Sequence, residues 1–196
     1  MSATQPPKSR RAALRRITAA SLENAALYYL QRFDGTAAHL RRVLQNKVRR
    51  AAAHPQAEVD TEAAQAWIDA AVAKMLRLGY IDDARTARSK ARGLYARGTP
   101  PAAIRRRLAA AGVGAEDAEA ALATLSEEEG ENRDLTLAAA LTLARRRRLG
   151  PFRAAAERQD RRDKDLAALG RAGFDYDTAR RVIDAPDAEA LEEEMS

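Results

Sequence analysis

The stretch LGYIDDARTARSKARGLYARGTPPAAIRRRLAAAG, residues 78–112, decides the fold class of this chain. Gly79 follows a long segment with helical apolar periodicity, and glycine supplies the positive φ that ends a helix. The carboxylates of Asp82 and Asp83 suit the free N–H groups at the start of the next helix. That helix should end where Gly98 interrupts it. The stretch therefore predicts a helix end followed directly by a new helix.

A second helix follows within the same stretch. Thr99 is a good N-cap, and Pro100 fits the first helical position, where a missing N–H has no consequence. The apolar periodicity then runs to Gly112, which is again placed to end a helix. Helix, turn and helix thus alternate with very short connections.

The same helix ending occurs three times along the chain. Gly79, Gly112 and Gly173 each occupy the position that a Schellman motif reserves for a positive-φ residue. Each has an apolar residue directly after it and another four residues before it, namely Tyr80 and Met75, Val113 and Leu108, and Phe174 and Leu169. The glycines are separated by 33 and then 61 residues, so the repeat is divergent and not of strict period. We interpret this as a helix-turn-helix pattern used repeatedly.

Composition bounds the class of protein. The 196 residues are 46% hydrophobic but only 5% aromatic, which favours thin layers of Ala, Leu, Val and Ile between close helices. Cysteine is absent, so disulfides, thiol nucleophiles and zinc-thiolate sites are excluded. No window shows strand periodicity, and no apolar run reaches the roughly 18 residues of a membrane span. We predict an all-α cytoplasmic protein without membrane contact.

The chain divides into segments of different composition. We expect a disordered basic arm at residues 1–19 and an acidic, frayed tail at 186–196. Between them we expect three-helix units at 20–81, 82–126 and 133–185. The acidic residues 126–132, which include Gly130, are interpreted as the linker between the second and third units.

Positive charge is concentrated in local blocks. Residues 1–54 carry 11 Lys and Arg against 2 Asp and Glu, while the total net charge is only +6. Residues 85–107 contain eight basic side chains and no acidic one, whereas a solvated helix face usually mixes both signs. Such blocks are typical of contact with a polyanion or an acidic protein surface. The candidate binding residues are Arg85, Arg88, Lys90, Arg92, Arg97, Arg105, Arg106 and Arg107, with Arg145, Arg146, Arg147 and Arg148 further along.

Residue patterns of known catalytic sites are missing. There is no phosphate-binding Walker loop and no nucleophile elbow. The two histidines, His39 and His54, are interpreted as surface residues. Asp82 and Asp83 could be imagined as a carboxylate pair for metal or acid-base work, but adjacent residues at a helix start do not face each other. We therefore predict no enzyme, no cofactor and no metal.

The region from Gly79 to Gly112, which contains the first two helix endings, resembles the signature of RecX-family regulators of RecA. The resemblance rests on Gly79, Tyr80, Ile81, Asp82, Asp83, Gly98, Ile104, Leu108 and Gly112, with Gly173 and Phe174 in the third unit. Weaker similarity extends from about Ser21 to Ile183, and Thr86 stands where the family usually places Phe. The resemblance implies three tandem three-helix units in an elongated, curved monomer. It also implies binding within the groove of the RecA filament on single-stranded DNA, with inhibition of filament extension, strand exchange and ATP hydrolysis.

Three functions remain open at the level of sequence. The first is a modulator that docks along the RecA filament through its basic residues, with direct binding to single- or double-stranded DNA as a further option. The second is a general helix-turn-helix DNA-binding or transcriptional protein, which needs base-reading side chains near the start of a recognition helix. Residues 100–103, Pro-Pro-Ala-Ala, occupy that place and count against it. The third is an adaptor for an acidic protein unrelated to DNA.

Overall fold

The structure is a computed structural model that describes residues 17–54, 59–130 and 133–194. The chain forms two compact units, Met1–Asp83 and Ala84–Ser196. Every regular element in the described ranges is a helix, and no strand occurs there. The predicted all-α fold is therefore confirmed.

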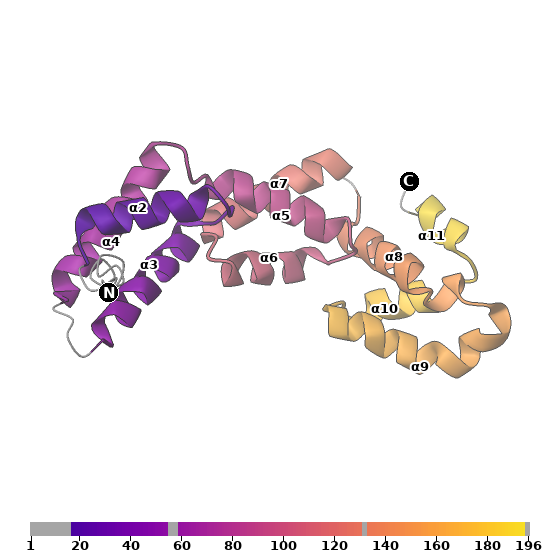
Figure 1. Ribbon diagram of the computed structural model, residues 1–196. Helices are drawn as coiled ribbons and strands as arrows, with labels where there is room; N and C mark the ends of the chain where they lie inside the picture. The colour runs from indigo at the N-terminus through magenta and orange to yellow at the C-terminus, as the bar shows by residue number, and fades with distance from the viewer. Residues whose placement is uncertain (1–16, 55–58, 131–132, 195–196) are drawn as a thin grey trace, which may run out of the picture. The chain divides into compact units, whose positions relative to one another are not determined.

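The first unit is a three-helix bundle (Figure 1). Its helices are α2 (Ala19–Leu30), α3 (Ala37–Ala52) and α4 (Thr61–Arg77), and both α2 and α3 pack on α4. One face of each helix is apolar, so the three faces close over a common core. The largest fully buried side chains are Leu22, Leu40, Leu44, Ile68 and Met75.

Local side-chain caps define where these helices begin. The Thr18 hydroxyl accepts from the Ser21 N–H while the Ser21 hydroxyl accepts from the Thr18 N–H, a capping box that starts α2. Ile17, just before it, is 8% exposed and belongs to the core. The predicted disordered arm at 1–19 is therefore wrong at its end, because residues 17–19 are packed or capped. Residues 1–16 of that prediction lie outside the described residues.

Asp83 has a role that the sequence did not reveal. Its two carboxylate oxygens accept from the N–H of Ala37, at 3.0 and 3.3 Å. Ala37 is the first residue of α3, so the carboxylate supplies a partner and a negative charge where the helix dipole is positive. Asp83 thus caps a helix 46 residues earlier in the chain, a role beyond the expected cap of its own helix.

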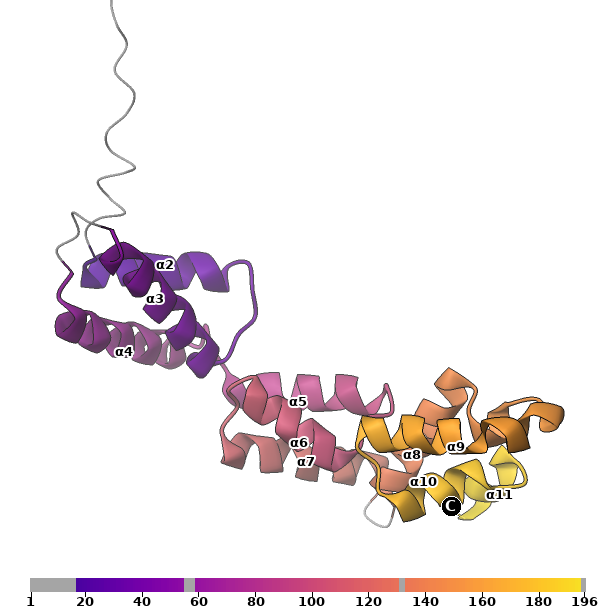
Figure 2. The same ribbon diagram turned by 90° about the horizontal axis from the view of Figure 1, so that it is seen from below.

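The second unit contains the remaining helices (Figure 2). They are α5 (Asp83–Tyr95), α6 (Pro101–Ala110), α7 (Ala115–Glu129), α8 (Leu135–Arg147), a 3-10 turn η1 (Gly150–Phe152), α9 (Ala155–Ala172), α10 (Tyr176–Ile183) and α11 (Ala188–Glu194). In both views α9 and α10 lie side by side, and both also pack on α8.

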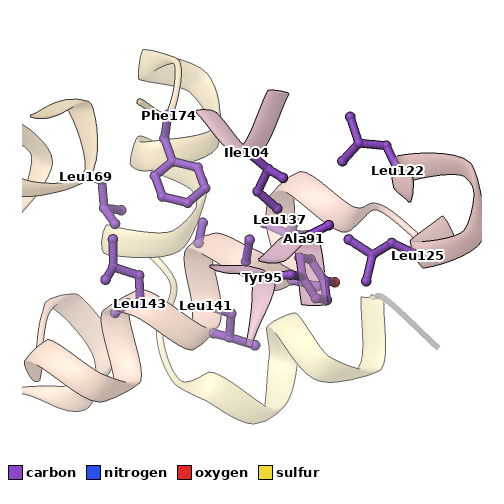
Figure 3. Packing of buried hydrophobic residues seen from close by; sticks show 14 of the residues in the cluster. Ala91, Tyr95, Ile104, Leu122, Leu125, Leu137, Leu141, Leu143, Leu169 and Phe174 are labelled. Atoms are coloured by element: carbon purple, nitrogen blue, oxygen red, sulfur yellow. The ribbon is translucent and has the colours of Figure 1, made fainter. Parts of the chain in front are cut away.

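One continuous core joins α5 to α11 (Figure 3). It includes Ile104 and Leu122 from the first half of the unit and Leu141, Leu169 and Phe174 from the second. The helix α7 continues to Glu129, so residues 126–129 are helical and are not the linker that the sequence suggested. The acidic run misled the prediction because a solvated helix end has the same composition as a linker.

The helix α8 contributes a run of small side chains to this core. Ala138, Ala139, Ala140 and Ala144 are all buried, which allows neighbouring backbone to come close. The closest approach is made by Gly98, where an added Cβ would lie 2.6 Å from the nitrogen of Leu143. Only glycine fits this position.

The repeated helix ending has the hydrogen bonds of a Schellman motif. Val113 N–H donates to Leu108 at 3.0 Å, and Phe174 N–H donates to Leu169 at 3.3 Å. Gly79, Gly112 and Gly173 all have positive φ. In the first copy Tyr80 makes the backbone bond to Met75 but its side chain is 55% exposed, so the expected apolar residue is wrong. Ile81, 3% exposed, is the buried residue there.

Residues 188–194 form the helix α11, contrary to the predicted frayed tail at 186–196, whose last two residues lie outside the described part of the chain. Asp187 accepts from the Ala190 N–H at 2.8 Å and so caps α11. Leu191 is 3% exposed and belongs to the core of the second unit. The acidic composition concealed one apolar residue that anchors the helix.

A buried carboxylate holds the start of the turn after α8. Asp165 on α9 is 3% exposed and accepts from the Gly150 N–H at 3.0 Å. The guanidinium of Arg153 donates to the same carboxylate through two nitrogens, at 2.9 and 3.2 Å. Because a buried charge needs such partners, Asp165 ties η1 to α9.

We predict that Gly98→Ala destabilises the second unit by about 2–5 kcal/mol. An alanine there must adopt left-handed backbone, which costs roughly 1–2 kcal/mol, and must also displace the backbone of α8. Urea-induced unfolding followed by circular dichroism measures the change. The matched control is Gly170→Ala on α9, where an added Cβ meets open space and helix propensity should add about 0.5–1 kcal/mol of stability. Equal midpoints for the two variants would contradict the close approach.

We also predict that Asp165→Ala destabilises the protein by about 1–3 kcal/mol, because the buried Gly150 N–H loses its acceptor. The stability of Asp165→Asn should lie between those of the wild type and Asp165→Ala, since the amide oxygen of asparagine can still accept a hydrogen bond from the Gly150 N–H. Asp163→Ala on the same helix is the control, because that side chain is 96% exposed. An Asp163 effect as large as the Asp165 effect in the same unfolding assay would refute this role.

Candidate functional site

A cleft of about 360 Å³ lies in the second unit between the ends of several helices. Five arginines line it, and no carboxylate is among its lining residues. The full lining is Arg97, Gly98, Thr99, Arg107, Leu143, Arg146, Arg147, Arg171 and Ala172. We call this feature the arginine cleft.

The five arginines all lie in or just after the last turn of a helix. Arg107, Arg147 and Arg171 lie in the last turns of α6, α8 and α9. Arg146 shares the last turn of α8, and Arg97 follows the end of α5. Four helix C-termini therefore meet at one cleft, each carrying basic side chains. A basic residue in the last turn is favoured because the C-terminus of a helix is its negative pole.

The wall of the cleft is held rigidly. Arg146 donates from Nη1 to the carbonyl oxygen of Arg97 at 2.7 Å, which joins α8 to the turn after α5. Gly98 packs against the backbone of α8, and Thr99 is only 8% exposed. The side chain of Arg97 thus projects from a packed turn, and that of Arg146 from the last turn of α8.

The structure brings together only part of the predicted basic set. Arg97, Arg107, Arg146 and Arg147 line the cleft, whereas Arg85, Arg88 and Lys90 do not. Arg106 lies beside Gly173, where its guanidinium is 3.0 Å from the position of an added Cβ. Arg145 stacks over the ring of Phe152 at 5.3 Å. Arg148 ends α8 with φ 54, the single non-glycine residue with positive φ among those described.

Two of the predicted binding residues are engaged in ion pairs. Arg92 binds Glu128 on α7, and Arg105 binds Glu119 on the same helix, in both cases through two nitrogens. These hydrogen bonds lower the pKa of Glu128 and of Glu119. Sequence reasoning missed both pairs, because the acids that compensate residues 85–107 come from a later helix.

Arg171 was missed as a site residue. It lies two residues before Gly173, within the third copy of the helix ending, and the tertiary structure alone brings it to the other arginines. A search for basic residues in the last turn of every helix would have found it, since such residues are placed by the helix dipole.

A second cleft, of about 390 Å³, lies beside Tyr95. Arg92, Arg133, Glu128 and Glu129 also line it, so its charges are balanced. Tyr95 is 8% exposed, and its hydroxyl has no hydrogen-bond partner within the described part of the chain. Burial raises the pKa of Tyr95 to about 12, and the negative charge of Glu129 adds to the rise.

The described residues hold no cluster of three or more His, Cys, Asp or Glu that could bind a metal ion. Across the same ranges, none of the helices is both long and apolar enough to cross a bilayer. The arginine cleft, with five guanidinium groups and no carboxylate in its lining, carries positive charge that suits an anion.

Comparison with known proteins agrees with the sequence resemblance. The family model "RecX, second three-helix domain" matches residues 82–122. The regulatory protein RecX of Myxococcus xanthus (strain DK1622) is 40% identical over 172 residues, which cover 87% of this chain and 88% of the relative. The chain belongs to the RecX family. The 82–122 match contains α6 and the turn at Gly98, so part of the arginine cleft lies inside the family's second three-helix domain.

Solved structures show the same fold. A crystal structure of RecX from Lactobacillus salivarius superposes with a TM-score of 0.55 at 22% identity, covering 89% of this chain and 97% of that one. A second crystal structure of a regulatory protein RecX gives a TM-score of 0.54 at 21% identity, with 94% and 81% coverage. Tandem three-helix units are thus the architecture of this RecX-family chain.

We predict that Tyr95→Phe changes the free energy of unfolding at pH 8 by less than about 1 kcal/mol, because the lost hydroxyl has no partner. The folded pKa of about 12 lies above the ordinary value of 10, so ionisation favours unfolding. The stability that the protonated Tyr95 hydroxyl contributes is fully present below pH 10 and is lost as the pH rises toward 12. In urea unfolding at pH 8 and 11, the Phe variant should lose less stability than the wild type, and an equal loss would contradict the buried hydroxyl.

Proposed function

We propose that this protein binds RecA and its filament on single-stranded DNA, and that it inhibits filament extension and the recombinase and ATPase activities of RecA. The observation that carries the proposal is the 40% identity to a regulatory protein RecX over 87% of the chain. The presence of an arginine cleft agrees with a binding protein.

The proposed mechanism needs no chemical step. A rigid helical protein that contacts a filament shifts the assembly equilibrium only as far as its affinity differs between assembled and free RecA. Occupying the filament surface blocks addition of further protomers or exchange of the DNA strand. The basic character of the chain, with a net charge of +6, favours fast association with a negatively charged nucleoprotein surface.

The helix-turn-helix alternative is less well supported by the geometry. A recognition helix must present its first residues to the major groove of duplex DNA. In the second unit Thr99 and Pro100, which precede α6, are buried, and Ala103 in its first turn is 4% exposed. The first turn of α6 thus exposes Ala102 and part of Pro101. Neither side chain carries a hydrogen-bonding group that could read base edges.

The direct test is ATP hydrolysis by RecA on single-stranded DNA with increasing amounts of this protein. We expect hydrolysis to fall as the protein is added, and to fall further when it is added before filament assembly than after. Bovine serum albumin at equal concentration is the control for nonspecific loss. Unchanged hydrolysis at a molar excess, together with sequence-specific binding to duplex DNA, would reject the proposal in favour of the helix-turn-helix alternative.

A further inference from the structure

We propose that the arginine cleft is a phosphate-binding site that holds the sugar-phosphate backbone of a single nucleic-acid strand. The inference deepens the proposed function, and rests on it for the identity of the strand as that of the RecA filament. It assigns Arg97, Arg107, Arg146, Arg147 and Arg171 to the DNA side of the complex.

The positive charge of the cleft exceeds the negative charge that the four helix dipoles place there. Each helix C-terminus carries the equivalent of roughly −0.5 of an elementary charge, so the four ends together present about −2. Five guanidinium groups supply five positive charges against them. About three positive charges remain without compensation from the helix ends or from a carboxylate in the lining. Structural stabilisation of helix ends alone does not explain so large an excess.

Phosphate suits this excess better than carboxylate. Elsewhere in the second unit a single arginine suffices for a single carboxylate: Arg162 donates to both oxygens of Asp184 at 2.6 and 2.7 Å, and Arg105 binds Glu119 in the same manner. Five arginines around one small cleft therefore match a ligand with many closely spaced anionic oxygens. A polynucleotide strand carries a negatively charged phosphate at every nucleotide, and guanidinium binds phosphate through two parallel hydrogen bonds.

The lining also indicates which part of the nucleic acid is bound. None of the nine lining residues is aromatic, so the cleft offers no ring on which a base could stack. It contains Leu143, Ala172 and Gly98 as apolar wall and Thr99 as the remaining polar residue. Contacts to phosphate without base contacts position a protein on a strand and do not read its sequence. We therefore expect binding without sequence preference.

A volume of about 360 Å³ is near the lower end of the range for small-ligand sites, roughly 300–1,000 Å³. This is enough for a phosphate with its neighbouring sugar. The same chemistry also fits a free polyphosphate, so the experiment distinguishes the two sources. A free nucleotide would leave its base without a stacking partner in this lining.

The test uses the full chain and a fluorescein-labelled oligothymidylate, with affinity measured by anisotropy between 50 and 300 mM NaCl. Arg107→Ala and Arg171→Ala should each weaken binding roughly tenfold at the lowest salt. Each should also reduce the slope of log affinity against log salt by about 0.7, the value for one lost phosphate contact on a single strand. Circular dichroism melting confirms that the variants are folded, and Arg107→Lys, which keeps the charge, should give an intermediate loss.

Arg105→Ala is the matched control, because Arg105 lies two residues before Arg107 on the same helix but is paired with Glu119. It removes the same charge and should leave the slope unchanged. Equal loss in the Arg105 and Arg107 variants would show general attraction and overturn the site. Unchanged affinity in both Arg107→Ala and Arg171→Ala would overturn it as well.

Two further arms separate this inference from the proposed function. If the cleft variants retain naked-DNA binding but no longer inhibit RecA, the cleft faces protein, and the inference fails while the proposed function stands. If they lose DNA binding while the wild type has no effect on RecA, the phosphate site stands and the proposed function fails. We expect sodium triphosphate to compete with the oligonucleotide only at millimolar concentration. Displacement at micromolar concentration would show that the ligand of the cleft is a free anion and not a nucleic-acid strand.

Discussion

The close approach of the turn at Gly98 to the backbone of α8 is the constraint on which the second unit depends. Positive φ and lack of a side chain are both required there, because an added Cβ would lie 2.6 Å from Leu143 nitrogen and 2.7 Å from Ala139 oxygen. The contact lies within the single hydrophobic core of the second unit, which runs from α5 to α11. It also brings Arg97 beside Arg146, and so forms one wall of the arginine cleft.

Helix termini explain why arginines gather in that cleft. Short connections between helices bring several C-termini together, and each attracts a basic residue because of the helix dipole. Where an acid is available the arginine forms a pair, as Arg105 does with Glu119. At the cleft none lines the site, so positive charge accumulates beyond the amount that the dipoles neutralise. Basic residues that each stabilise one helix end thus add up to a cleft with concentrated positive charge, the basis of the phosphate site that we propose.

Much of the fold could be predicted from sequence because its signals are local. The glycine helix endings and the all-α class depend on a few neighbouring residues. The errors concern features that depend on distant residues. Residues 126–129 are acidic enough to resemble a linker, and residues 186–196 are acidic enough to resemble a tail, yet α7 continues to Glu129 and Leu191 is buried. The composition of a helix shows that one of its faces is exposed to solvent. It does not show whether the opposite face packs against another helix.

The candidate site divides in the same way. The sequence by itself determined that basic residues concentrate in residues 85–107 and 145–148, and the family resemblance followed from the glycine signature. Tertiary structure alone decided which of these arginines meet. Arg92 and Arg105 are paired by acids of α7, whereas Arg97, Arg107, Arg146 and Arg147 converge with Arg171. The physical reason is that charge is a property of each residue, whereas charge density depends on distances between residues that only the packing of helices fixes.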